Sequence, residues 1–266
     1  MGNSDPDSPR RGGEGAGGVQ SVDRAISVLE ILARNGGAGV SEVAADIGVH
    51  KSTAFRLLAA LEERGLVEQN HDPGRYQLGF GILRLASAIP ARLDLVQQAR
   101  PVLDELAASL GETVNLAVLR EHYAVNVDQA RGPAAVSAQN WVGQLTPLHA
   151  TSSGKVLLAN LPQPQRAELI ERNGLPRLTE ATVTSATALE QSLAKVREDG
   201  YATAFEELEV GLNAVAVPVC DDRNSVVGAV SVSGPAYRLD AARIERLVPD
   251  LFAGGRRISE RMGHLG

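Results

Sequence analysis

The sequence predicts an α+β chain with two domains, a winged helix-turn-helix followed by an antiparallel sheet with packed helices. Three observations support this fold class. Residues 40–78 alternate helical and extended patterns around glycines, residues from 113 onwards mix short strands with helices, and 266 residues suffice for two domains with cores. The order helix, turn, helix, hairpin in the first half indicates DNA as its partner.

The first half is expected to contain short helices and a hairpin. Apolar residues recur at helical spacing before Gly36, and Gly48 and Gly65 each follow a further helical stretch as a stop signal. A turn that contains Pro73 and Gly74 separates two extended runs, as in a wing. The expected helices are 20–33, 41–47 and 50–64, and the expected strands are 66–69 and 75–78.

The helix expected over 50–64 has the pattern of a recognition helix. The apolar residues Ala54, Leu57, Leu58 and Leu61 recur at the spacing of one helical face and can pack on the earlier helices. The first turns of such a helix enter the major groove, where Arg, Lys, Ser and Thr reach base edges or phosphates and Phe can touch a thymine methyl. Arg75, at the start of the second wing strand, is expected to contact a phosphate. The predicted DNA contacts are His50, Lys51, Ser52, Thr53, Phe55, Arg56 and Arg75.

Net charge limits how tightly one such unit can hold DNA. Residues 19–90 carry seven Arg and Lys against eight Asp and Glu, a net of −1, and residues 91–266 carry 17 against 21, a net of −4. DNA-binding domains are usually basic, because affinity comes mainly from phosphate neutralisation. A single unit should therefore bind weakly, and pairing in a homodimer or a dimer of dimers would compensate.

The second half has the mixed pattern of a sheet covered by helices. Pro90 interrupts the first helical stretch after the wing, so we place the link between domains there. The expected helices are 80–88, 93–110, 154–160, 164–173, 189–199 and 241–262, and the expected strands are 113–119, 123–127, 201–205, 214–219 and 226–233.

Composition excludes several classes of protein. Aromatic residues make up only 3%, so Ala, Val, Leu and Ile must build the cores. No run of about 18 uncharged apolar residues exists to span a membrane. The single Cys220 excludes an intramolecular disulfide and a multi-cysteine metal site. Residues 1–18 have no apolar stretch and are expected to form a disordered leader. We expect a cytoplasmic protein without a membrane partner or a cofactor.

Several separate motifs resemble the isocitrate lyase regulator (IclR) family. They are residues 21–26, 51–53, 56–58, 61–65 and 75–79 in the first half and 111–116, 147–151, 154–155 and 231–235 in the second. The resemblance covers nearly everything after Gln20. It implies a one-component regulator with a winged helix-turn-helix, a linker helix and a GAF-like effector-binding domain, which we place at residues 19–79, 80–92 and 93–266.

Some positions depart from what this resemblance implies. Phe55 stands where the family often has His, which indicates a different operator preference. Ala214 stands where many members have Cys, and Ala204 where some have an Asp that touches a carboxylate effector, so the keto-acid pocket of the family is not simply copied. Residues 122–126 and 141–145 resemble actinobacterial members that control the catabolism of allantoin and related ureides.

Polar residues at strand ends indicate a ligand pocket in the second half. Ser152 and Ser153 precede a helix whose free N–H groups could receive a carboxylate, although either serine could instead cap that helix. Ser231 and Ser233 alternate along a strand and so share a face. His149 is either a contact or a structural histidine. The predicted effector contacts are Asn115, Asp128, Trp141, His149, Ser152, Ser153, Asn213, Ala214, Ser231 and Ser233.

Enzyme motifs are incomplete throughout the sequence. Residues 151–156 lack the first glycine of a phosphate-binding loop and the hydroxyl residue after Lys155, and no Gly-x-Ser-x-Gly elbow occurs. Cys220 has no evident His partner. The prediction is therefore a DNA-binding transcriptional regulator, a repressor controlled by a small anionic metabolite, and not an enzyme. The alternatives left open are a protein-interaction adaptor and a GAF-like enzyme.

Overall fold

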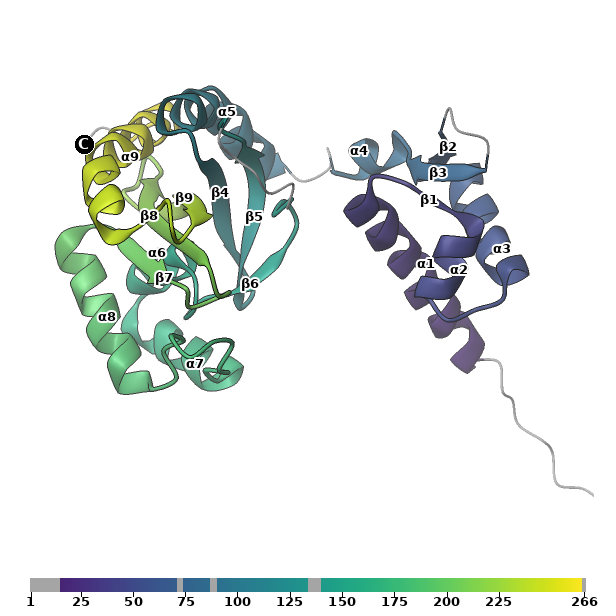
Figure 1. Cartoon of the computed structure of the whole chain (residues 1–266), viewed down its shortest axis with the longest axis horizontal. Helices are drawn as coiled ribbons and strands as arrows, with labels where there is room; N and C mark the ends of the chain where they lie inside the picture. The colour runs from purple at the N-terminus through teal and green to yellow at the C-terminus, as the bar shows by residue number, and fades with distance from the viewer. Residues whose placement is uncertain (1–14, 71–73, 87–89, 134–139, 265–266) are drawn as a thin grey trace, which may run out of the picture. The chain divides into compact units, whose positions relative to one another are not determined.

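The computed structural model describes residues 15–70, 74–86, 90–133 and 140–264 (Figure 1). Residue contacts divide the chain into two compact units, residues 1–90 and 91–266. The turn residues 71–73 and the first 14 residues of the expected leader lie outside the described ranges. Residues 15–18, which we had also assigned to the leader, belong to the first helix, so that assignment was wrong for them.

The first unit is a winged helix-turn-helix, as predicted. Its helices are α1 (Gly15–Asn35), α2 (Val40–Asp46), α3 (Lys51–Glu63) and α4 (Gly81–Ala86), and its strands are β1 (Ala38–Gly39), β2 (Val67–Gln69) and β3 (Arg75–Leu78). The strands form an antiparallel sheet in the order β1-β3-β2. Buried Val28, Leu32, Val43, Leu58 and Tyr76 join the helices to this sheet in one core. This packing leaves the first turns of α3 at the surface.

The second unit is a six-stranded antiparallel sheet with helices on both faces. Its helices are α5 (Pro90–Leu110), α6 (Ser152–Ala159), α7 (Gln163–Asn173), α8 (Ala186–Asp199) and α9 (Ala241–Arg261). Its strands are β4 (Thr113–Arg120), β5 (Tyr123–Ala130), β6 (Leu145–Pro147), β7 (Ala202–Phe205), β8 (Leu212–Cys220) and β9 (Val226–Pro235). They lie in the order β6-β5-β4-β9-β8-β7, which confirms the α+β class.

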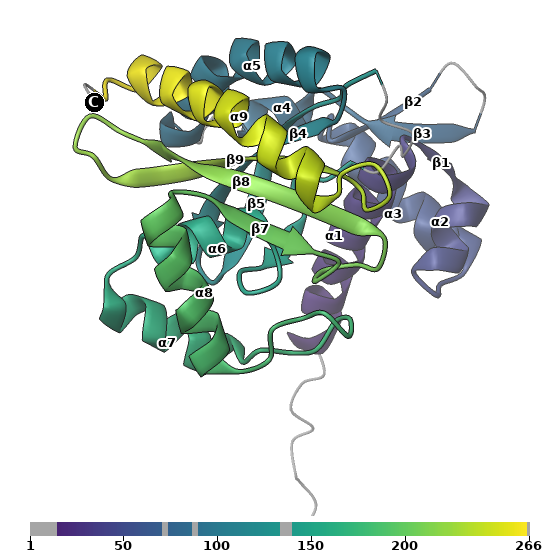
Figure 2. The same ribbon diagram turned by 60° about the vertical axis from the view of Figure 1, so that its left-hand side comes forward.

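The two faces of this sheet carry separate cores. Helices α5 and α9 cover one face, and α6, α7 and α8 lie on the other (Figure 2). Leu103, Leu116 and Leu251 belong to the core under α5 and α9, whereas Leu158 and Leu193 belong to the core under α6 and α8. Because strand side chains alternate between faces, the central strands β4, β5, β8 and β9 contribute to both cores. A shift of one residue in the register of a strand would therefore move its polar side chains to the opposite face of the sheet.

Two glycines allow α9 to lie close to its neighbours. A Cβ atom at Gly254 would lie 2.5 Å from Leu106 Cδ1, and one at Gly255 would lie 2.8 Å from Val217 Cγ2. Real Cβ atoms do not approach so closely, so glycine permits this contact of α9 with α5 and β8.

The structure corrects some of the expected boundaries. Strand β6 was not predicted, and β5 continues to Ala130 instead of ending at Val127. The first helix after the wing covers Gly81–Ala86, and Pro90 begins the next helix, where proline is tolerated because it lacks the N–H that would be unpaired. Among the described residues, no helix is long and apolar enough to cross a membrane.

Candidate functional site

The first turns of α3 present a polar, exposed surface. Lys51, Ser52 and Arg56 are exposed, Thr53 is half-buried, and Phe55 is 53% exposed although it is aromatic. An apolar ring that large gains nothing from exposure to water, so its position favours contact with a partner. His50 is the N-cap residue of α3 in extended conformation, and its side chain is also exposed. The structure thus brings the six predicted contacts of α3 onto one helical end.

Arg75 on β3 is already engaged within the unit. Its guanidinium donates to the Gly37 carbonyl oxygen at 2.9 Å and to Glu42 Oε1 at 3.3 Å. The other oxygen of Glu42 accepts the Gly39 N–H at 2.9 Å. That hydrogen bond and the charge of Arg75 lower the pKa of Glu42. The predicted phosphate contact of Arg75 therefore competes with an internal ion pair.

A small cavity in the second unit gathers most of the predicted effector contacts. It holds about 50 Å³ and opens between β4, β8, β9 and the start of α6. Seven predicted residues line it: Asn115, Trp141, Ser152, Ser153, Ala214, Ser231 and Ser233. Its remaining wall consists of Asn126, Thr146, Ala150, Thr151, Ala204, Leu208 and Leu212. None of the described residues that line it is charged, so neutral polar groups would have to bind any anion.

Thr151, and not either serine, caps helix α6. Its Oγ1 accepts the Gly154 N–H at 3.1 Å and donates to the Pro147 carbonyl oxygen at 2.9 Å. Ser152 and Ser153 therefore occupy the first turn of α6, buried to 2% and 6% exposure. Their backbone N–H groups belong to the helix start, where no intrahelical acceptor exists. The possibility that one of these serines serves only as a cap is thereby removed.

Several cavity hydroxyls have no partner in the described part of the chain. The side chains of Ser152, Ser153 and Ser231 line the cavity and make no hydrogen bond there, and neither does the side-chain amide of Asn126. Ser233 Oγ accepts the Asn115 amide at 3.1 Å, which leaves its proton to donate. Buried polar groups are nearly always hydrogen-bonded, so this cluster is suited to a polar guest.

Asp128 does not line the cavity, because a β-bulge turns it to the opposite face. Leu116 pairs with Asp128 and Ala117 with Asn126, so Val127 is the extra residue. Asp128 Oδ1 instead accepts a hydrogen bond of 2.9 Å from the Arg100 guanidinium on the α5 side, whereas Asn126 lines the cavity. The alternation of hydrophobic and polar residues pointed to this region, but only the bulge decides which polar residue enters the cavity.

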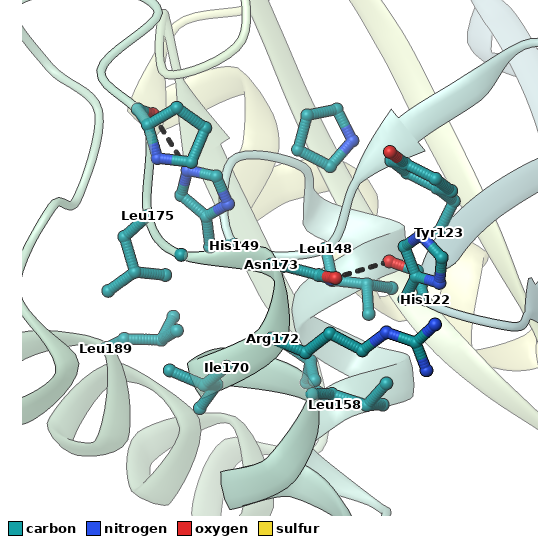
Figure 3. A pocket seen from close by; sticks show the side chains of 14 residues that line it. His122, Tyr123, Leu148, His149, Leu158, Ile170, Arg172, Asn173, Leu175 and Leu189 are labelled. Carbon is teal, nitrogen blue, oxygen red and sulfur yellow. Dashed lines mark hydrogen bonds between the residues drawn. The ribbon is translucent and has the colours of Figure 1, made fainter.

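Asn213 and His149 also point away from the cavity. Asn213 lies between the lining residues Leu212 and Ala214 on β8, so it faces the other side, where its amide donates to the Leu239 carbonyl oxygen at 2.9 Å and accepts the Glu206 N–H at 3.0 Å. His149 Nε2 lies 3.1 Å from the Pro176 carbonyl oxygen (Figure 3). Because a carbonyl only accepts, Nε2 carries the proton. Burial lowers the pKa of His149 and keeps it neutral.

Lys155 of α6 forms a buried ion pair with Glu207. Lys155 Nζ donates to Glu207 Oε1 at 2.6 Å and to the Thr203 carbonyl oxygen at 3.1 Å. Lys155, which resembled a phosphate-loop lysine in sequence, is 3% exposed and does not line the cavity. Its role is to tie α6 to the residues after β7.

Comparisons with known proteins place both units in one family. The model of the IclR helix-turn-helix domain matches residues 21–71, and the model of the bacterial transcriptional regulator IclR C-terminal domain matches residues 88–260. The HTH-type transcriptional repressor AllR of Salmonella typhi is 36% identical over 227 residues, which cover 85% of this chain and 84% of the relative.

Solved structures agree with this match. The crystal structure of Thermotoga maritima IclR has a TM-score of 0.76 and 29% identity, with 92% of this chain and all of that chain covered. An IclR homolog from Microbacterium hydrocarbonoxydans, complexed with 4-hydroxybenzoate, has a TM-score of 0.74 and 27% identity, with coverage of 92% and 98%. The chain belongs to the IclR family of transcriptional regulators, which bind DNA through the helix-turn-helix and are not enzymes.

Proposed function

We propose that this regulator is a repressor whose binding to operator DNA is controlled by a small anionic metabolite in the serine-lined cavity. The observation that carries the proposal is the set of serine hydroxyls that line the cavity beside the start of α6 and make no hydrogen bond within the described residues. Helix N-termini bind carboxylates through free N–H groups and the helix dipole. The hydroxyls of Ser152, Ser153 and Ser231 would complete the set of donors.

The size of the cavity limits the effector. By the volume that one water needs, about 50 Å³ accepts roughly four water-sized groups. A glyoxylate-sized acid fits that space better than allantoin or allantoate, so we favour glyoxylate-linked control within ureide catabolism. Ala204 and Ala214 face each other across β7 and β8, and their methyl groups leave an apolar side to the cavity. The solved relative with 4-hydroxybenzoate supports a carboxylate as the effector class.

On DNA, α3 would enter the major groove in the cytoplasm, where the operator is accessible. Lys51 and Arg56 are exposed, and neither forms an ion pair within the described residues. Two or four copies of the chain would present paired recognition helices to a palindrome. The effector would change their relative placement through α4 and α5, since it stabilises one arrangement over the other.

The DNA assignment is tested with a double variant. Lys51→Ala/Arg56→Ala should lose operator affinity, whereas Lys195→Ala/Arg197→Ala on α8 should keep it. Binding that is as tight in the first variant as in the wild type would contradict the assignment. Binding that weakens steeply with salt separates operator recognition from a role as a protein-interaction adaptor.

The effector assignment is tested by thermal shift of the full chain with glyoxylate, allantoin and allantoate. Ligand that binds only the folded state raises the melting temperature. Glyoxylate should stabilise the wild type and not Ser153→Ala, because alanine removes only the hydroxyl and adds no bulk to the cavity. No stabilisation by any of the three at millimolar concentration would contradict the ureide assignment.

A further inference from the structure

A second and larger cavity lies on the same face of the sheet as the serine-lined one. It holds about 380 Å³ and opens between the β4–β5 turn, the segment before α6, and the end of α7 (Figure 3). Its walls share no residue with those of the serine-lined cavity. Residues 146–151 separate the two, because Thr146, Ala150 and Thr151 line the smaller cavity while residues 147–149 line the larger.

The interior of this second cavity is aliphatic. Its aliphatic lining residues are Leu148, Leu158 of α6, Leu169 and Ile170 of α7, Leu175, and Leu189 of α8. A volume of 380 Å³ is within the range of natural small-molecule sites. Such walls favour a ligand with an apolar body of several carbon atoms.

One cation stands at the rim of the cavity. Arg172, near the end of α7, is exposed and makes no ion pair within the described ranges. Figure 3 shows its guanidinium on the side of the cavity where His122 lies. The backbone there is held in place, since the Asn173 amide donates to the His122 carbonyl oxygen at 2.8 Å. An uncompensated guanidinium beside an apolar cavity suits a carboxylate.

His149 supplies a neutral polar group on the inner side. Its Nε2 hydrogen is used by the Pro176 carbonyl oxygen, so Nδ1 is an acceptor. Tyr123 also lines the cavity and carries a hydroxyl; its ring centroid lies 4.5 Å from that of His122, with the two ring planes tilted by 42°. These groups orient a ligand without adding charge, which leaves Arg172 as the charged contact.

We propose that this cavity is a second ligand site, for a small amphipathic monocarboxylate. The apolar body lies among Leu148, Ile170 and Leu175, and the carboxylate pairs with Arg172 at the rim. The site differs in chemistry from the serine-lined cavity, which has room for only a few polar atoms and whose described lining residues include no cation. The proposal does not depend on the identity of the effector in the smaller cavity.

The test measures binding of 3-phenylpropanoate to the full chain by calorimetry, with uncharged 3-phenylpropanol as the comparison. Arg172→Gln should weaken the acid by roughly 3- to 10-fold and leave the alcohol unchanged, as expected for one charge-assisted contact. Ile170→Phe should weaken both compounds because it fills the cavity. The matched control Arg177→Gln removes a nearby exposed arginine that does not line the cavity and should change neither.

Three results would overturn the proposal. They are the absence of binding by either compound at millimolar concentration, equal binding of the acid to wild type and Arg172→Gln, and loss of binding in Ser231→Val, which would place the ligand in the smaller cavity. If Ile170→Phe fails to fold, the comparison of acid and alcohol in Arg172→Gln still decides the outcome, since an exposed arginine has little role in folding.

Discussion

The number of cations that the winged helix can bring to DNA phosphates depends on a few single residues. Lys51 and Arg56 are free to meet phosphates, but Arg75 is held by Glu42 and the Gly37 carbonyl oxygen. The ion pair is exposed, with side-chain exposures of 42% and 55%, so it is weak. A phosphate can therefore displace Glu42 at small cost, and removing the acid should remove even that cost.

Glu42→Gln is accordingly predicted to tighten operator binding by about 2- to 5-fold. The slope of log affinity against log salt concentration should become more negative by about one, as for one additional phosphate contact. Gln keeps an oxygen that can accept the Gly39 N–H, so the start of α2 is preserved. Fluorescence anisotropy with labelled operator measures both quantities. Glu63→Gln removes an exposed acid at the end of α3 without releasing an arginine and serves as the control for net charge. Equal gains in both variants would show that Arg75 has no special role.

His149 should make stability depend on pH. Burial lowers the pKa of His149 in the folded chain, so the unfolded chain binds the proton more readily. Its stabilising contribution is then complete above the unfolded pKa of about 6.5 and is lost as pH falls below it. Urea unfolding of His149→Gln should show a smaller loss of stability between neutral pH and about pH 5.5 than the wild type. His50→Gln, which changes an exposed histidine, should keep the wild-type dependence.

At the scale of elements, the Lys155–Glu207 pair connects α6 to the segment after β7. Both residues are buried, and Glu207 Oε2 has no hydrogen-bond partner in the described chain. Lys155→Met would leave that carboxylate buried without a counter-charge, which costs about 3 to 5 kcal/mol. The double variant Lys155→Met/Glu207→Leu should recover most of this loss, because no charge remains to be buried.

Denaturant unfolding measures both variants, with Arg257→Gln as the matched control. Arg257 forms an exposed ion pair with Glu105 at 2.7 Å, so its loss should leave the unfolding midpoint nearly unchanged. A double variant as unstable as Lys155→Met alone would show that the pair holds α6 by specific geometry and not by charge compensation.

Element types could be predicted from the sequence wherever periodicity and glycine stops agree. Gly48 and Gly65 correctly indicated where α2 and α3 end. Ser231 and Ser233 line the same cavity, as their alternation along the strand indicated. Asp128 was placed wrongly because the bulge at Val127 reverses the alternation, and no residue pattern marks that bulge. Asn126, which the sequence analysis missed, takes the place expected for Asp128.

At the scale of the whole molecule, net charge predicts how the chain must meet DNA. The chain carries −6 overall and residues 19–90 carry −1, so attraction to phosphates comes from a few local cations. If one unit neutralises roughly two to four phosphates, the slope of log affinity against log salt is about −2 to −4 on a single half-site. Two such units in one oligomer neutralise twice as many phosphates, so the slope is about twice as steep.

Full-length protein is therefore predicted to show about twice the salt slope on a duplex with two half-sites as on a duplex with one. The operator is first selected from random duplexes, and half-site centres should be separated by a whole number of helical turns, since paired recognition helices meet the same side of DNA. Inserting half a turn between half-sites turns one of them away and should return the slope to the single-site value. Equal slopes on all three duplexes would mean that one winged helix suffices, which would contradict the paired arrangement inferred from the charge.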